Sequence, residues 1–236
     1  MKRQLLLSNS TSEKGGFLGH ATDEISDFLG SSVVDILFVP YAAVTNSFDD
    51  YTFRTREPFR KCGYRLISIH ECGDIINAIS EAQAIAVGGG NSFCLLRRLY
   101  EAQVLDAIRQ RIAAGIPYIG WSAGANLACP TIKTTNDMPI VWLPSLDALE
   151  VIPFQINPHY IEGNPPGVSG ETRRQRLEEF TCLNRNIYVI GLPEGGMIRI
   201  EGNTIPLKGC QSATVFLADR QPTVEDSLQF LGKLLD

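Results

Sequence analysis

Hydrophobic and polar residues follow two different rhythms along this chain. Short, nearly continuous apolar runs predict buried β-strands, and longer runs with apolar residues three or four apart predict helices. Over most of the chain these two kinds of segment take turns. Such alternation is typical of an α/β fold with a mostly parallel sheet that is covered by helices on both faces.

The predicted elements can be placed on the sequence. The strands are expected at residues 4–9, 33–42, 64–70, 84–90, 116–122, 149–158 and 187–195. The helices are expected at residues 16–30, 46–63, 74–82, 91–114, 123–128, 171–183 and 225–236. Asn46 or Ser47 would cap the second helix. The helix at 91–114 is expected to break near Gln103.

The pattern changes near the C-terminus. Residues 197–210 and 212–219 alternate apolar with polar positions around a Gly-Asn turn. This pattern predicts antiparallel strands at a sheet edge. Such strands could pair with a second copy of the chain, so a homodimer is one predicted assembly.

Composition narrows the class of protein. The chain has 236 residues, of which 44% are hydrophobic, so one α/β domain over residues 1–236 is expected. A net charge of −5 without a dense basic cluster argues against a nucleic-acid surface. Six cysteines without a CxxC pair indicate free thiols in a reducing compartment. No apolar run approaches a membrane span or signal peptide, which predicts a cytoplasmic protein that does not bind membranes.

Three predicted strands end in unusual residues, in the stretches VGGGN, GWSAG and GLPEGG. In folds of this class, ligands bind beyond the carboxyl ends of the strands. We therefore expect the three stretches to meet at one site.

Ser122 lies in GWSAG, between a predicted strand and a predicted helix. This is the pattern of a nucleophile elbow, in which a tight turn exposes the serine oxygen. The N–H of Ala123, at the start of the helix, would then face a developing oxyanion. In the alternative interpretation, Gly120 and Gly124 serve only close packing of the strand and helix.

A serine nucleophile needs a base, and the chain has three histidines. His20 and His70 are most simply structural or surface residues. His159 lies where a strand enters a loop rich in proline and glycine, so its imidazole could reach the serine oxygen. His159 is therefore the preferred base, against the alternative of a turn histidine without a chemical role.

The base in turn needs an acid to orient it. Glu194 ends an apolar strand, where an unpaired carboxylate would be costly, and pairing with an imidazole N–H would explain it. Asp137, in the polar loop after the elbow, is the competing candidate. The order Ser, His, Glu differs from that of α/β-hydrolases, which makes a lipase or esterase less attractive.

The glycine loop VGGGNSF allows two interpretations. It lacks the features of a P-loop or a dinucleotide site. In the preferred interpretation, N–H groups around Gly89 and Gly90 complete an oxyanion hole with Ala123. The sequence contains no HExxH motif and no rhythm of cysteine ligands, so neither a metal nor another cofactor is predicted.

Together these stretches resemble the peptidase E (α-aspartyl dipeptidase) family, serine peptidase family S51. The resemblance rests on VGGGNSF, YIGWSAGANLACPTIKTTNDMPIV, QINPHY, GETRRQR and GLPEGG in this order, and on LLLSNST and VPYAAVTNSFDDYT near the start. It implies a flavodoxin-like fold related to class I glutamine amidotransferases. It also implies a cytoplasmic serine peptidase that cleaves dipeptides with an N-terminal aspartate.

The resemblance also implies roles for individual residues. Ser122 would be the nucleophile, His159 the base and Glu194 its orienting acid, with Gly90 and Ala123 in the oxyanion hole. Arg173 matches the position expected to bind the aspartyl carboxylate, for which a guanidinium is well suited. Asp137 would bind the free amino group of the substrate, and Asn91 beside the glycine loop is a further candidate for substrate binding.

Three other functions are weighed against this interpretation. A cyanophycinase-like peptidase would share the elbow but cleave an aspartate-based polymer. A glutamine amidotransferase would carry cysteine instead of Ser122. A sensor on the same scaffold would bind an acidic small molecule without turnover, which the presence of all three triad candidates disfavours.

Overall fold

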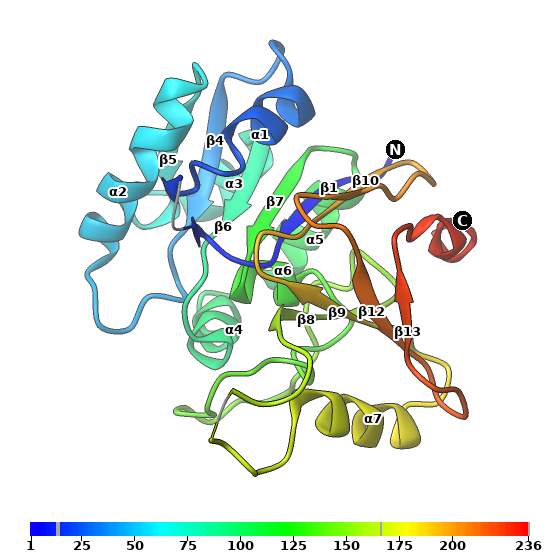
Figure 1. Cartoon of the computed structure of the whole chain (residues 1–236). Coiled ribbons are helices and arrows are strands. Elements are labelled where there is room, and N and C mark those ends of the chain that lie inside the picture. Colours follow the sequence, from blue (N-terminus) through cyan, green and yellow to red (C-terminus); the bar gives the residue numbers. More distant parts are fainter. Residues whose placement is uncertain (13–14, 166, 236) are drawn as a thin grey trace.

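The computed structural model describes residues 1–12, 15–165 and 167–235. Its strands form a seven-stranded sheet, a four-stranded sheet and a small two-stranded hairpin (Figure 1). The α/β class, the mostly parallel main sheet and the antiparallel strands near the C-terminus agree with the prediction. The second sheet was not foreseen, and it contributes half of the site described below.

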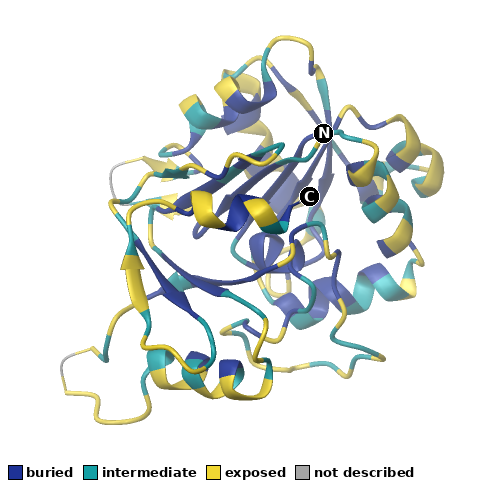
Figure 2. Cartoon of the chain, turned by 90° about the vertical axis from the view of Figure 1, so that its right-hand side faces the viewer, coloured by how far each residue is buried: buried dark blue, intermediate teal, exposed yellow. Residues whose placement is uncertain are grey.

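The seven-stranded sheet has the order β11-β10-β1-β7-β6-β4-β5. Its parallel strands are β1 (Arg3–Leu7), β4 (Asp35–Val39), β5 (Arg65–Ser68), β6 (Ala84–Val87) and β7 (Tyr118–Trp121). At one edge, β10 (Met197–Glu201) and β11 (Leu207–Lys208) run antiparallel, with β10 paired to β1. Nearly every residue in the parallel strands is buried, as their apolar sequences require (Figure 2).

Helices cover both faces of this sheet because successive strand side chains point to opposite sides. Leu5 and Leu7 pack with α1 (Thr22–Leu29) and α2 (Phe48–Lys61). Leu6 belongs to the opposite core. The helices of that core are α3 (Ile75–Glu81), α4 (Ser92–Glu101), α5 (Leu105–Ala113) and α6 (Ala123–Leu127).

The four-stranded sheet has the order β13-β12-β9-β8. Its strands are β8 (Gln155–Tyr160), β9 (Val189–Pro193), β12 (Ala213–Phe216) and β13 (Thr223–Glu225), and α7 (Arg173–Leu183) lies against it. Ile156 and Ile190 join the same core as α6, so the second sheet packs on that side of the first. Between β9 and β10 the chain passes directly from the second sheet into the first.

Two predicted helices are wrong in part. The helix expected at 16–30 begins only at Thr22, because Gly16–Phe17 (β3) pairs with Thr11–Ser12 (β2) in a hairpin. The helix expected at 225–236 is a 3₁₀ helix over Gln229–Leu234, preceded by β13, and Asp236 lies outside the described residues. The strand expected at 149–158 is β8, which begins only at Gln155 and extends to Tyr160. Elsewhere the elements agree with the prediction to within a few residues, including the cap at Ser47 and a break at Gln103, whose φ is 56°.

Candidate active site

Ser122 lies at the turn between β7 and α6, with φ 53° and ψ −112°. This backbone conformation is rarely adopted by residues other than glycine, and it is the strained turn expected of a nucleophile elbow. The flanking glycines are needed for packing, because a Cβ at Gly120 would lie 2.4 Å from the oxygen of Gly124, and one at Gly124 would lie 2.2 Å from the oxygen of Val87. The packing interpretation of these glycines and an exposed serine oxygen are therefore compatible.

His159 lies near the end of β8 and also has a positive φ, of 55°. The register of β8 against β9 shifts between Asn157 and Tyr160, which is a bulge that redirects the side chain between them. The N–H of His159 donates to Ser8 Oγ at 2.8 Å, and Ser8 in turn donates to the oxygen of Leu192. Ser8 directly follows β1 of the large sheet, and its side chain thus bonds to the backbones of two strands of the small sheet, β8 and β9.

Glu194 lies in the link between β9 and β10. Its Oε1 is 2.5 Å from His159 Nδ1, and His159 Nε2 is 2.8 Å from Ser122 Oγ. One imidazole thus bridges a hydroxyl and a carboxylate, so the structure brings together the three side chains that the sequence singled out. Asp137, the competing acid, hydrogen-bonds to other groups.

The glycine loop lies directly against the serine. A Cβ at Gly89 would be 2.9 Å from Ser122 Cβ, and one at Gly90 would be 2.2 Å from the oxygen of Ala42. Gly90 also has φ 141°, so only glycine fits this loop without strain. Within the described ranges, no group accepts a hydrogen bond from the N–H of Gly90, and Ala123 is the first residue of α6, where backbone N–H groups lack helical partners.

A hollow of about 450 Å³ opens beside the serine and histidine, within the usual range for small-molecule sites. Its walls are the loop 42–46, residues 89–91, Ser10, Tyr51, Arg54, Ser122, Ile140 and His159. The space is thus bordered on one side by Ser122 and His159 and on another by Tyr51 and Arg54 of helix α2.

Asp137 and Asn91 brace the rim of this hollow. Oδ2 of Asp137 accepts hydrogen bonds from the N–H and hydroxyl of Ser92 at 2.7 Å each, and one from Thr135. Asn91 caps α4 through Cys94 N and donates to the oxygen of Met138. Both the oxygen and the nitrogen of the Asn91 side-chain amide are therefore engaged within the protein, whereas Oδ1 of Asp137 accepts from no described residue.

Arg173 is the first residue of α7 and lies behind His159 rather than in the walls of the hollow. Its guanidinium donates to the oxygens of His159 and Pro158. Burial lowers the pKa of Arg173, and the charge of Glu194 partly offsets this effect. A cation therefore stands within the electrostatic reach of His159 and Glu194.

Sequence reasoning missed Ser8, Tyr51 and Arg54. Ser8 follows a parallel strand directly, so the rule that sites lie at strand ends could have found it. Tyr51 is buried, and its hydroxyl donates to the oxygen of Gly89 at 3.0 Å while accepting from Trp121 Nε1. Burial raises the pKa of Tyr51 to about 12, so its hydroxyl stays protonated and keeps α2 bonded to the glycine loop.

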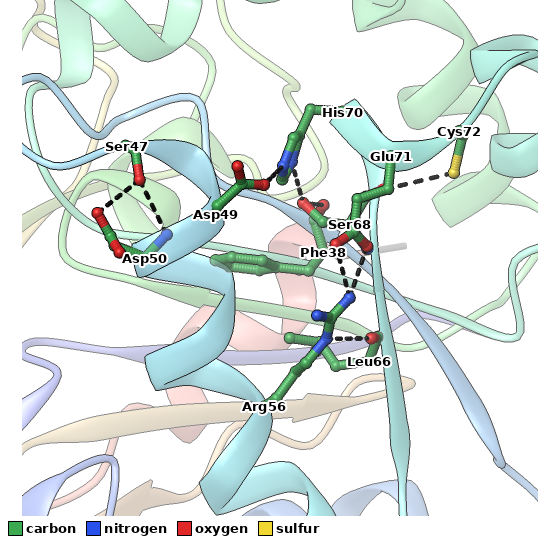
Figure 3. A network of polar contacts seen from close by, with 10 residues as sticks. All are labelled: Phe38, Ser47, Asp49, Asp50, Arg56, Leu66, Ser68, His70, Glu71 and Cys72. Atoms are coloured by element: carbon green, nitrogen blue, oxygen red, sulfur yellow. Dashed lines mark hydrogen bonds and ion pairs between the residues drawn. The ribbon is translucent and has the colours of Figure 1, made fainter.

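One further cluster has the composition of a metal site. Ligand atoms of Asp49, His70 and Glu71 lie within 4.8 Å of one another (Figure 3). Glu71 is bound by Arg56 at 2.6 Å and 2.8 Å, and His70 bridges Ser68 and Asp49. A cation would have to displace these partners, so the cluster is better explained as a brace between α2 and β5.

The comparisons with known proteins agree on one family. Residues 4–208 match the model of Peptidase family S51. The chain is 50% identical over 215 residues to peptidase E of a Nostoc species. The matched region covers 91% of this chain and 89% of that protein. It is 44% identical over 212 residues to peptidase E of Haemophilus influenzae, covering 88% and 97% of the two chains.

Solved structures are similar as well. A putative peptidase E protein from Listeria monocytogenes superposes with a TM-score of 0.67 at 25% identity, covering 89% of this chain and 99% of that one. A peptidase from an acI-B1 Actinobacterium, at 14% identity and a TM-score of 0.65, shares the fold. A family model and relatives that span most of the chain lead to one conclusion: the chain belongs to Peptidase family S51.

Proposed function

We propose that the chain is a serine dipeptidase that hydrolyses dipeptides with an N-terminal aspartate. The observation that carries this proposal is His159, whose two ring nitrogens contact Ser122 Oγ and Glu194 Oε1 beside an open hollow. Family membership and relatives called peptidase E support the same reaction.

The proposed reaction is acyl transfer in two steps. His159 takes the proton of Ser122 as its oxygen attacks the carbonyl carbon of the aspartate, and the N–H groups of Gly90 and Ala123 hold the oxyanion. His159 then gives the proton to the leaving amine as the peptide bond breaks. Water, deprotonated by the same histidine, hydrolyses the aspartyl ester and releases aspartate.

Glu194 holds the imidazole in the tautomer that accepts from serine and stabilises the imidazolium that forms. Arg173 acts on the aspartate side chain through its charge, because it stands behind His159 and does not line the hollow. Asp137 binds the free amino group of the substrate. Its Oδ1 is available for this contact, because the hydrogen bonds from Ser92 go to Oδ2. Asn91 contributes by fixing the rim, since its amide is bonded within the protein.

Location and assembly remain predictions. Six free thiols support a reducing, cytoplasmic compartment. Among the described residues, no helix combines the length and the apolar character needed to cross a membrane. Pairing of two chains into a homodimer, like the division of the chain into one domain, is a prediction from the sequence pattern.

The test compares initial hydrolysis rates of aspartyl-leucine and asparaginyl-leucine. These substrates differ only in the charge of the side chain, and a site that reads the carboxylate should cleave the second roughly a hundredfold more slowly or worse. Ser122→Ala should abolish cleavage, while Ser80→Ala, at an exposed position on α3, should leave it unchanged. Equal rates on both dipeptides would remove the aspartate specificity, and no cleavage of either would favour the polymer-cleaving or sensor functions.

A further inference from the structure

Arg54 is a cation at the active-site hollow that stacks on aromatic rings and has no acidic partner among the described residues. The residue lines the same space as Ser122 and His159. Its guanidinium lies over the rings of Phe17 and Tyr51, at 4.6 Å and 5.2 Å from their centroids. In the described part of the chain, no carboxylate or carbonyl pairs with it, whereas other arginines on α2 bind acidic residues, Arg56 to Glu71 and Arg60 to Glu57.

The position of this cation is well defined. Tyr51, one helical turn earlier on α2, is bonded to Gly89 and Trp121, so the face of the helix that carries Arg54 is fixed to the glycine loop. The brace of Asp49, His70, Arg56 and Glu71 ties the same helix to the region after β5 (Figure 3). Stacking on two aromatic rings also orients the guanidinium without consuming its N–H donors.

His159 and Arg54 are connected along one wall of the hollow through Ser8, Ser10 and the hairpin that carries Phe17. Ser8 accepts from the N–H of His159, and Ser10, two residues later, lines the hollow. The oxygen of Ser10 accepts from Leu18 N, which holds the hairpin that carries Phe17. Because His159 must protonate the leaving amine, the residue after the scissile bond lies on this side of the serine.

We infer that Arg54 binds the C-terminal carboxylate of the dipeptide and so sets the length of substrate that the enzyme prefers. This inference rests on the proposed function. An aspartyl dipeptide carries two carboxylates. With Arg173 assigned to the side chain, the free C-terminus requires a second cation, and the guanidinium fork of Arg54 suits a carboxylate.

This contact would discriminate against longer peptides. In a longer chain the second residue ends in an amide, which carries no charge and cannot form the paired contact. A site that is built around a charged hydrogen bond favours the substrate that supplies it over an analogue that lacks it. The enzyme would therefore prefer dipeptides even though the hollow is open.

The test uses aspartyl-leucine and aspartyl-leucine amide, which differ only at the C-terminal group. The native enzyme should show the lower KM for the free acid. Arg54→Met should raise that KM about tenfold, leave kcat close to native, and leave the amide unchanged, so that the preference disappears. Arg54→Lys should keep part of the preference, because the charge remains.

The matched control is Arg60→Met, on the same helix and paired with Glu57 away from the hollow. It should change neither substrate. If Arg54→Met affects both substrates equally, or neither, the assignment to the C-terminus is wrong. If the native enzyme cleaves no aspartyl substrate, the proposed function fails first, and this inference falls with it.

Discussion

The two sheets contribute to the site in different ways. Ser122 comes from the large sheet, where a short turn of small residues dictates the conformation of the serine locally. His159 and Glu194 come from the small sheet and its exit, and their positions depend on a bulge and on Ser8 from β1. Both Ser122 and His159 have a positive φ, but only for Ser122 do the neighbouring residues in the sequence predict this conformation.

This difference indicates that local sequence sets the conformation of Ser122, the proposed nucleophile, whereas packing between the sheets positions His159, the proposed base. Four hydrogen bonds tie the small sheet to β1 and to the α6 region at this point. Ser8 bonds to His159 and Leu192, Asn126 Nδ2 of α6 donates to the oxygen of Ile156, and the N–H of Ile156 donates to Cys129 Sγ. Substitutions in the site should therefore mainly lower kcat, whereas substitutions at these contacts should mainly lower the free energy of unfolding.

Apart from Ser122 and His159 themselves, the largest effect is expected from Glu194→Gln. The amide can no longer stabilise the imidazolium and favours the wrong tautomer of His159, so kcat for aspartyl-leucine should fall roughly 10³- to 10⁴-fold. The free energy of unfolding should change little, since the Glu194 side chain is 55% exposed. A loss below tenfold in steady-state kinetics would remove Glu194 from the triad.

Gly89→Ala should have the next largest effect. Its Cβ would press on Ser122 Cβ at 2.9 Å and displace the loop that carries the proposed oxyanion N–H group of Gly90. Loss of such a donor corresponds to a roughly 10²- to 10³-fold lower kcat. Gly73→Ala, where a Cβ meets nothing within 4 Å, is the control and should remain fully active in the same assay.

Ser8→Ala would break the link between the sheets. The buried hydroxyl accepts from one strand end and donates to another, so its removal should lower the free energy of unfolding by about 1–3 kcal/mol. We also expect a decrease in kcat on the order of tenfold, because His159 loses its anchor. Urea unfolding and kinetics on the same samples measure both quantities, and Ser26→Ala on α1 serves as an exposed control. Unchanged stability would show that the sheets are joined without this residue.

Cys129→Ala should affect stability more than catalysis. The thiol is fully buried and accepts from the N–H of Ile156, and burial raises its pKa to about 12, so it is neutral under ordinary conditions. Leaving that N–H unpaired should cost about 1–3 kcal/mol of unfolding free energy, with kcat within a fewfold of native. Exposed Cys182→Ala should change neither measurement. A large loss of kcat at Cys129 with native stability would indicate a direct role that the structure does not explain.

The same contrast explains what the sequence could predict. The elbow, the glycine loop and the meeting of three strand ends follow from local patterns, and the structure brings them together as expected. The hairpin at Phe17 could not be predicted in this way, because the Phe17 ring packs against Tyr51 and Trp121, which are far away in the chain. Likewise Glu225, which was expected to begin the last helix, lies in β13 because it pairs with Ala213.

Arg54 shows the same limit within the site. Its sequence neighbourhood is that of an ordinary exposed helix face, and only the packing of α2 on the glycine loop reveals that it borders the hollow. The existence of a second sheet could not be predicted either, because the apolar runs of β8 and β9 fit equally well in one large parallel sheet. Patterns in sequence indicate which segments are buried, but the partner of each strand depends on contacts far away in the chain.

The most direct test of the account is a double-variant comparison of Ser122→Ala, His159→Ala and both together on aspartyl-leucine. If one residue from each sheet forms a single catalytic unit, each single variant should lose nearly all of kcat. The double variant should then be no more than a fewfold slower than either single one. Losses that multiply in the double variant would show that Ser122 and His159 act independently, and would contradict the shared triad.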